Sequence, residues 1–230
     1  MGKNKPAKYL KYAVGEIILV VIGILIALQI NNWNEGRIRQ NDSNTSLAQI
    51  FNDLQEDKDF LELYIKQEAE HVSTLTAIIK GDNSQALDSI LQSLDHYMYF
   101  AENNNGYSSL KTSGGISNIS NSELKSSLTN YYEKTYGNLS MTSNFTEKFT
   151  NDRVIPFLIA NLRPDIDMLT TNDLVLEKLE TSNLRYLINY QINVKKYSII
   201  QVRKGLKNIF ELILLIEKEL GLKNSKSTTR

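Results

Sequence analysis

Residues 13–30 read AVGEIILVVIGILIALQI, and this stretch decides the architecture of the chain. Twelve of its residues are Ile, Leu or Val, which together favour membrane insertion by about 4 to 7 kcal/mol. A carboxylate at the bilayer centre would cost roughly 3 kcal/mol, and Glu16 lies near one end of the stretch. The sequence therefore predicts a transmembrane helix over residues 13–32.

The flanks of this helix predict its orientation. Residues 1–12 contain no acid and four lysines, Lys3, Lys5, Lys8 and Lys11. By the positive-inside rule these residues form a basic cytoplasmic leader, so the rest of the chain lies across the membrane. Trp33 then falls at the outer interface, where an amphipathic ring is favoured. We expect residues 33–42 to be a linker or an extension of the helix.

A cleaved signal peptide is the main alternative for this segment, since a charged start and a short apolar core fit it as well. However, no A-x-A-like cleavage site follows, because the apolar stretch ends with Ala27-Leu28-Gln29-Ile30-Asn31. An uncleaved signal anchor is the better interpretation.

Small and charged residues inside the span suggest contacts with another helix. Glu16 either extends toward the leader lysines at the membrane surface or pairs with a group on a neighbouring span. Gly23 and Ala27 form a small-xxx-small pair, and Gly15 lies two turns before Gly23, so two spans can approach closely here. We predict membrane or assembly contacts at Gly15, Glu16, Gly23, Ala27 and Trp33.

Residues 43–222 have helical periodicity almost throughout. The first helix carries an apolar heptad row from Leu47 to Ile79 and ends before Gly81, and a shorter one is expected from Leu87 to Ala101. A third begins at the capping box Ser120-x-x-Glu123 and continues, with a bend near Gly137, until Pro156.

After a turn at Arg163-Pro164-Asp165, the last helix is expected from Asn172 or Asp173 to Leu220, before Gly221. The fold class is therefore all-α: an N-terminal transmembrane helix followed by an extramembrane helical bundle of three to four long helices. The bundle domain covers residues 43–222, and residues 223–230 are expected to be a disordered tail.

The segment of residues 107–121 has no clean period and contains a pair of glycines, Gly114 and Gly115. A connection of this length in a compact domain is either functional or carries a short element of its own. Gly114 and Gly115 are accordingly a candidate loop site.

No constellation of catalytic residues is evident. The chain has no cysteine, and its 26 basic and 26 acidic residues balance, which argues against thiolate chemistry and nucleic-acid binding. Glu68-x-x-His71 is the only spacing that resembles a metal site, but it occurs once, and His96 has Ser93 where a second Glu is needed. We interpret Glu68 as part of a solvated helix face. Glu68 and Lys58 both interrupt the apolar row of the first helix, as edge residues or a buried polar pair do. We predict no catalytic, cofactor or metal site.

Three tyrosines, Tyr131, Tyr132 and Tyr136, lie close to the glycine segment in sequence. They either line a pocket or pack in the core with their hydroxyls at its rim, and the core is the usual place for such a helix face.

Two stretches of the chain are similar to a known family. Residues 9–34, YLKYAVGEIILVVIGILIALQINNWN, and the looser residues 110–132 resemble an uncharacterised family of bacterial, bacteroidete-type single-span membrane proteins with a domain of unknown function. The resemblance implies a bacterial inner membrane but no activity. It makes Glu16 and Gly114 positions worth mutating.

Together these observations predict a non-enzymatic inner-membrane protein without cofactor. Its periplasmic bundle binds a second copy of itself or another envelope protein, while lipid surrounds the span. The alternative is a sensory bundle that binds a ligand, whose nature the sequence does not specify, and signals through a partner.

Overall fold

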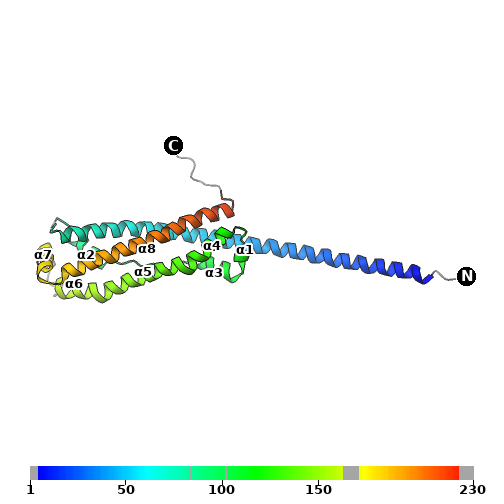
Figure 1. Cartoon of the computed structure of the whole chain (residues 1–230), viewed down its shortest axis with the longest axis horizontal. Helices are drawn as coiled ribbons and strands as arrows, with labels where there is room; N and C mark the ends of the chain where they lie inside the picture. Colours follow the sequence, from blue (N-terminus) through cyan, green and yellow to red (C-terminus); the bar gives the residue numbers. More distant parts are fainter. Residues whose placement is uncertain (1–4, 83, 102, 163–170, 223–230) are drawn as a thin grey trace, which may run out of the picture.

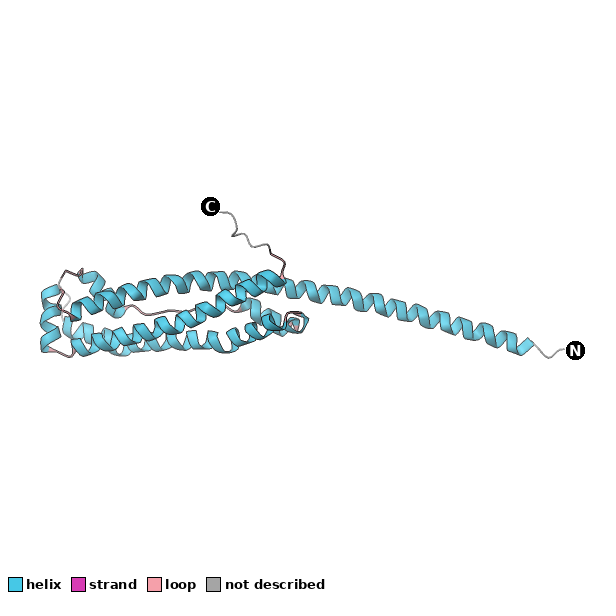
Figure 2. Ribbon diagram, turned by 45° about the horizontal axis from the view of Figure 1, so that its top comes forward, coloured by secondary structure: helices cyan, strands magenta, loops and turns pink. Residues whose placement is uncertain are grey.

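The computed structural model of the chain describes residues 5–82, 84–101, 103–162 and 171–222. Throughout these residues the regular structure is helical, with no strand (Figure 2). One helix, α1 (Lys5–Ile79), runs through the whole molecule and extends far beyond the bundle at its N-terminal end (Figure 1).

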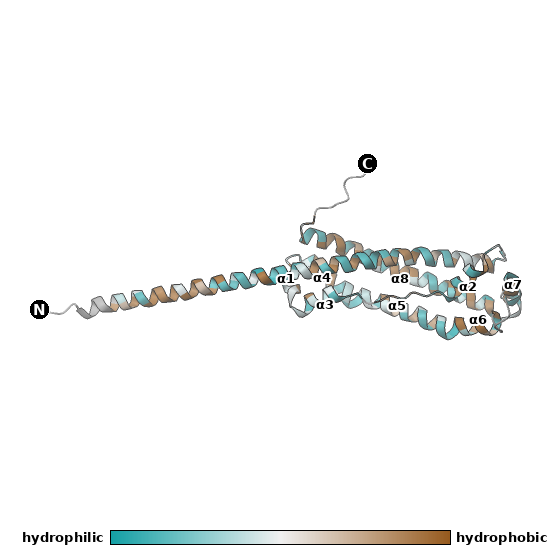
Figure 3. Ribbon diagram, turned by 180° about the vertical axis from the view of Figure 1, so that it is seen from behind, coloured by the Kyte–Doolittle hydropathy of each residue, from teal (hydrophilic) through white to brown (hydrophobic). Residues whose placement is uncertain are grey.

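The N-terminal half of α1 stands alone. Every residue from 12 to 35 is exposed, and the first buried residue of the helix is Ser43. Coloured by hydropathy, this half is apolar over the predicted span and hydrophilic where it approaches the bundle (Figure 3). Because α1 is unbroken, residues 33–42 form the helix extension that was one of the two expectations, and not a separate linker.

The bundle consists of the C-terminal half of α1, the long helix α8 (Leu184–Glu219) and a composite helix between them. The composite helix is α4 (Ser122–Asn130), the π turn η2 (Tyr131–Thr135), α5 (Tyr136–Phe149), the π turn η3 (Thr150–Val154) and α6 (Ile155–Leu162). The short elements are α2 (Leu87–Asp95), α3 (Asn105–Thr112), the 3-10 turn η1 (Gly115–Asn118) and α7 (Asn172–Thr181).

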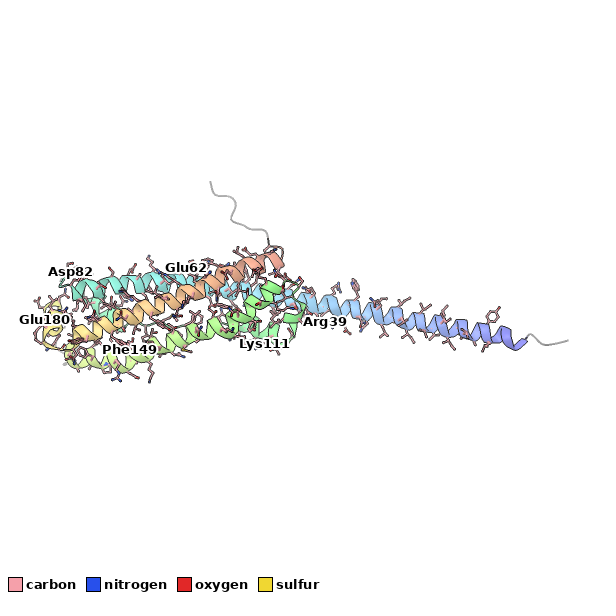
Figure 4. All side chains as sticks on the ribbon, viewed as in Figure 1. Arg39, Glu62, Asp82, Lys111, Phe149 and Glu180 are labelled. Atoms are coloured by element: carbon pink, nitrogen blue, oxygen red, sulfur yellow. The ribbon has the colours of Figure 1, made fainter. Side chains whose placement is uncertain are left out.

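The two ends of the bundle differ in composition. Helices α3 and α4 and the end of α8 surround the point where α1 leaves, whereas α2, α6 and α7 lie at the far end (Figure 1). We call these the proximal and the distal end. Figure 4 labels Arg39 and Lys111 at the proximal end and Asp82 and Glu180 at the distal end.

Two apolar cores fill the bundle, one toward each end. The proximal core includes Leu47, Ile50, Leu54, Leu110, Tyr131 and Ile209. The distal core includes Leu75, Ile90, Leu94, Leu158, Leu184 and Ile188. Glu68 of α1 and Lys195 of α8 form an ion pair, and each lies on its helix between the residues of the two cores. Burial of each large apolar side chain contributes roughly 1.5 to 3 kcal/mol, which explains why the amphipathic stripes of α1 and α8 meet.

The predicted ends of the two longest helices are confirmed. Helix α1 ends at Ile79 and is followed by Gly81 with φ +85°, and α8 ends at Glu219 before Gly221 with φ +66°. Only glycine adopts such a left-handed conformation without strain, so these residues stop the helices.

The second predicted helix is wrong in its C-terminal part, because α2 ends at Asp95 and not near Ala101. The following segment is held by side chains from elsewhere in the chain. The Ser143 hydroxyl of α5 accepts a hydrogen bond from the Phe100 amide at 3.0 Å and donates one to the Met98 carbonyl at 2.9 Å. These bonds replace the ones that a helix would have made.

The predicted capping box is also wrong by one residue. Asn121 is the N-cap of α4, and its side-chain oxygen accepts bonds from the amides of Glu123 and Leu124. Ser120 instead bonds through its amide and its hydroxyl to Glu219, at 3.2 and 3.0 Å. This contact ties the start of α4 to the end of α8.

Pro156 does not end the composite helix, which continues to Leu162. The π turn η3 ends two residues before this proline, and the other π turn, η2, ends two residues before Gly137, where a bend was expected. Inserted residues of this kind reposition the helix hydrogen bonds, so a proline near one is tolerated.

The last predicted helix is two helices, since α7 and α8 are separated at Ser182. The Ser182 hydroxyl donates to the Lys178 carbonyl at 2.6 Å and lies 3.2 Å from the Leu184 amide, which donates to it. Ser182 thus closes one helix and opens the next. The predicted turn at residues 163–165 and the predicted tail at 223–230 lie outside the described residues.

The segment of residues 107–121 carries elements of its own, α3 and η1, as one of the two expectations had it. Helix α3 approaches α1 most closely at Gly106. A Cβ atom added there would lie 2.8 Å from the Ile50 amide nitrogen. Glycine is therefore required at this crossing.

Candidate functional site

The most unusual group of side chains lies buried between the two apolar cores. Glu68, His71, His96 and Lys195, which we call the Glu68 cluster, come from α1, from the residue after α2 and from α8. Glu68 is 1% exposed and Lys195 2% exposed. Such burial of two charged groups is sustained only when each is paired and hydrogen-bonded.

The carboxylate of Glu68 is the centre of this cluster. Its Oε1 atom lies 3.1 Å from His71 Nδ1 and 2.8 Å from His96 Nδ1. The Lys195 ammonium donates to Oε1 at 3.2 Å, to Oε2 at 3.1 Å and to the His96 carbonyl at 2.9 Å. One carboxylate therefore joins α1, α8 and the extended segment after α2.

Burial by itself raises the pKa of Glu68, but hydrogen bonds from His71 and His96 and the charge of Lys195 outweigh it. They lower the pKa of Glu68 to about 2. Burial lowers the pKa of Lys195, and the Glu68 carboxylate opposes this effect. The carboxylate is consequently ionised at neutral pH and accepts bonds from its three neighbours.

The sequence predicted this region only in part. The interpretation of Glu68 as a solvated helix face is wrong, because the side chain is buried in a polar pair. Its partner is Lys195 and not Lys58, which contacts Gln55 and Asp59. Sequence reasoning missed Lys195 and the position of His96. One signal was available, because Lys195 interrupts the apolar stripe of α8 between Ile192 and Ile199.

The Glu68 cluster offers three atoms of the kinds that bind transition metals. One carboxylate oxygen and one nitrogen from each imidazole lie within 4.8 Å of one another. The side chains of His71 and His96 are 13% and 31% exposed, so solvent reaches the group from their side.

A second polar group lies in the proximal core. Asp57 of α1 is 5% exposed, and the Tyr131 hydroxyl donates to its Oδ2 atom at 3.3 Å. Burial raises the pKa of Asp57 to about 7; the Tyr131 hydrogen bond opposes the shift, and the charges of Asp53 and Glu56 add to it.

The three tyrosines singled out in the sequence belong to this core. Tyr131, Tyr132 and Tyr136 are at most 9% exposed. Their rings contact one another with centroids 4.9 to 5.8 Å apart. Of the two interpretations, packing in the core is confirmed, but the hydroxyls of Tyr131 and Tyr132 are buried inside the core and do not lie at its rim.

The predicted membrane or assembly residues all lie on the exposed half of α1. Gly15, Glu16, Gly23, Ala27 and Trp33 contact nothing in the bundle, and a Cβ atom added at either glycine would meet no atom within 4 Å. At 3.6 residues per turn, Glu16, Gly23 and Ala27 share one face, from which Gly15 is turned by about 80°. Their predicted contacts with lipid or another span stay predictions.

Gly114 and Gly115 allow a tight turn and a close approach to α1 where that helix enters the bundle. Gly114 has φ +72°, which a side chain would strain. A Cβ atom on Gly115 would lie 2.7 Å from Leu110 and 2.9 Å from the Ser43 hydroxyl. Ser43 also donates to the Gly115 carbonyl at 3.4 Å, so this loop packs against α1 at its first buried residue.

A groove with a volume of about 480 Å³ lies between α5 and α8 on the surface of the bundle. Its lining is mostly apolar, and its residues are Met141, Thr142, Phe145, Tyr190, Asn193, Val194 and Tyr197. Met141 is 68% exposed and Tyr197 53% exposed.

In the part of the chain that the structure describes, the fold is all-helical, and the exposed N-terminal half of α1 is long and apolar enough to span a membrane. The chain belongs to a family of unknown function, DUF6090, which matches residues 16–155. The match agrees with the expectation of an uncharacterised family, while the single membrane span and the bacteroidete type stay predictions. Comparisons with curated proteins and with solved structures gave no match. The matched region contains Glu68, His71 and His96, whereas Lys195 lies beyond it.

Proposed function

We propose that this protein is a non-enzymatic, single-pass protein of the bacterial inner membrane. Its N-terminus lies in the cytoplasm, and its helical bundle lies in the periplasm and binds a second copy of the chain or another envelope protein. The observation that carries this proposal is the apolar half of α1, which no other described part of the chain covers.

The exposed apolar surface of α1 favours a lipid environment. The best window of 18 residues has a mean hydropathy of 2.6, and none of it is buried. Large side chains such as Leu19 and Ile17 are 73% and 63% exposed. Lipid would cover this surface at a gain of about 4 to 7 kcal/mol on the insertion scale.

The unbroken helix would hold the bundle at a fixed height. Residues 33–42 cover about 15 Å at a rise of 1.5 Å per residue. The interfacial layer on one side of a bilayer is about 5 to 8 Å thick. The bundle would therefore stand roughly 7 to 10 Å clear of the headgroups, which suits a protein that contacts a partner beside the membrane.

Two surfaces support association. Glu16, Gly23 and Ala27 form a face of the span on which helices can pack closely. The groove between α5 and α8 exposes Tyr190 and Tyr197, and tyrosine is enriched at protein interfaces. The non-enzymatic part of the proposal rests on the absence of a recognisable catalytic motif in the sequence.

Native mass spectrometry of the full chain in mild detergent tests the association. We expect a homo-oligomer or a stoichiometric complex with an envelope protein. The Gly23→Leu/Ala27→Leu and Tyr190→Ala/Tyr197→Ala variants should each reduce it. Tyr99→Ala is the matched control, because Tyr99 is 69% exposed and does not line the groove. A monomer without partners for the wild type would contradict the proposal.

Glu16→Gln separates the two interpretations of this residue. If Glu16 pairs with a neighbouring span, the variant still inserts but the complex weakens. If Glu16 extends to the membrane surface, the complex is unchanged.

The groove favours one second candidate function, a membrane-anchored sensory bundle that binds a ligand. Its volume of about 480 Å³ falls in the range of small-molecule sites, about 300 to 1,000 Å³. A thermal-shift screen of small apolar molecules distinguishes the two. A compound that stabilises the wild type but not the Tyr190→Ala/Tyr197→Ala variant would support sensing. A screen that finds no such compound would support the first proposal.

A further inference from the structure

We propose that Glu68, His71 and His96 bind a zinc ion. The ligands would be Glu68 Oε1 and the Nδ1 atoms of the two histidines, with a water molecule as the fourth ligand. The inference concerns the middle of the bundle and is independent of the proposed membrane topology.

The chemistry of the three groups suits zinc. Two imidazoles and one carboxylate are a ligand set that zinc uses in proteins, with one position left for water. Two ligands, Glu68 and His71, are one helical turn apart on α1, so their backbone positions are fixed relative to each other. The third, His96, follows the last residue of α2 and reaches the same oxygen atom of Glu68.

The distances also fit. Bonds of about 2.0 to 2.1 Å in a tetrahedral site place the ligand atoms about 3.3 Å apart. Glu68 Oε1 lies 3.1 Å from His71 Nδ1 and 2.8 Å from His96 Nδ1. These two distances would lengthen by a few tenths of an ångström around the ion. All three ligand atoms lie within 4.8 Å of one another, so the two histidine rings would also adjust toward a common centre. Each neutral ring would change tautomer, because Nδ1 can bind the ion only when the ring proton lies on Nε2.

Access and support come from opposite sides. His71 and His96 are partly exposed, so an ion and its water enter from the surface. On the buried side, the Lys195 ammonium donates to Oε2 at 3.1 Å and to Oε1 at 3.2 Å. Its bond to Oε2 would fix the carboxylate in place, while zinc would replace the ammonium as the partner of Oε1. The positive charge of Lys195 also repels the ion, so zinc affinity is held below what the three ligands could give.

Bound zinc would join α1 to the extended segment after α2. In the described structure that segment is also held by the bond from Lys195 to the His96 carbonyl. The consequence is a bundle whose middle layer is stabilised by the metal in addition to the ion pair.

The test uses the full chain purified in detergent through a histidine-free tag and stripped with EDTA. Isothermal titration with Zn²⁺ should give one ion per chain, and Co²⁺ should give the intense visible absorption of a tetrahedral site. His71→Ala and His96→Gln should each weaken binding by at least about tenfold. Glu62→Gln, an exposed carboxylate on the same helix, should leave it unchanged.

Lys195→Met provides a readout of opposite sign. Removal of the ammonium should tighten zinc binding and increase the rise in melting temperature on zinc addition. Circular dichroism confirms that each variant is folded, and His96→Gln keeps the test valid if Lys195→Met unfolds. The proposal is overturned if the wild type does not bind micromolar Zn²⁺ stoichiometrically, or if both histidine variants bind as the wild type does.

Discussion

Asp57→Asn should stabilise the bundle at neutral and alkaline pH. The pKa of Asp57 is raised from 3.8 to about 7 because the side chain is buried among apolar and acidic neighbours. Ionising it in the folded state is therefore costly, whereas it ionises freely in the unfolded chain. An asparagine of nearly the same shape carries no charge, and its oxygen still accepts the Tyr131 hydrogen bond.

The sign and size follow from proton linkage. A raised pKa means that the folded state holds the proton longer, so the contribution of Asp57 is fully favourable below pH 3.8. It is lost as the pH rises toward 7. A shift of about three units corresponds to about 4 kcal/mol. The asparagine amide must itself find a partner at a cost of about 1 to 3 kcal/mol, so we expect a net gain of roughly 1 to 3 kcal/mol at pH 8.

Urea unfolding of the full chain in detergent, followed by circular dichroism from pH 4 to pH 8, measures this gain. The informative quantity is the free energy of unfolding of the variant minus that of the wild type, since other titrating groups cancel. This difference should grow from acid pH to pH 7 and then level off. Asp59→Asn is the matched control, because its side chain is 73% exposed on the same helix. A variant that is less stable than the wild type at pH 8, or a difference that does not depend on pH, would refute the reasoning.

Three further comparisons test the packing of the bundle by the same unfolding assay. Lys195→Met should lower the free energy of unfolding by about 3 to 5 kcal/mol, because it leaves the Glu68 carboxylate buried without its cation. The Glu68→Gln/Lys195→Met double variant should lose less than the sum of the two single variants, and additive losses would contradict the pairing. Gly106→Ala should lower the free energy of unfolding by about 1 to 3 kcal/mol, since its Cβ would meet Ile50. Gly137→Ala, in open space on α5, should raise it by about 0.5 to 1 kcal/mol. Equal effects of the two variants would count against the close crossing of α3 and α1. Asn121→Ala should cost about 1 kcal/mol through loss of the N-cap, and an unchanged stability would show that α4 does not need it.

The long helices were predictable because their signals are local. The apolar row of α1 up to Ile79 and the glycines at 81 and 221 act over a few residues, and the structure agrees with them. The errors arose where distant side chains decide the backbone. The segment after Asp95 is extended because Ser143 and Lys195 bond to its backbone, and neither is near it in sequence.

The candidate site shows the same limit. Glu68 and His71 could be paired from their spacing, but His96 lies 28 residues from Glu68, and Lys195 lies 127 residues from it. Only the packing of α8 against α1 brings the lysine to the carboxylate. The groups on the span are the reverse case, because periodicity alone places Glu16, Gly23 and Ala27 on one face of α1.

The central claim is that α1 crosses the membrane with the bundle on the periplasmic side. The chain has no cysteine, so single cysteines at Asn4 and at the exposed Ser108 of α3 give unambiguous labels. Spheroplasts are treated with a membrane-impermeant maleimide before and after lysis. We predict that Ser108→Cys is labelled in intact spheroplasts and that Asn4→Cys is labelled only after lysis. The reverse pattern, or recovery of the chain in the soluble fraction, would contradict the claim.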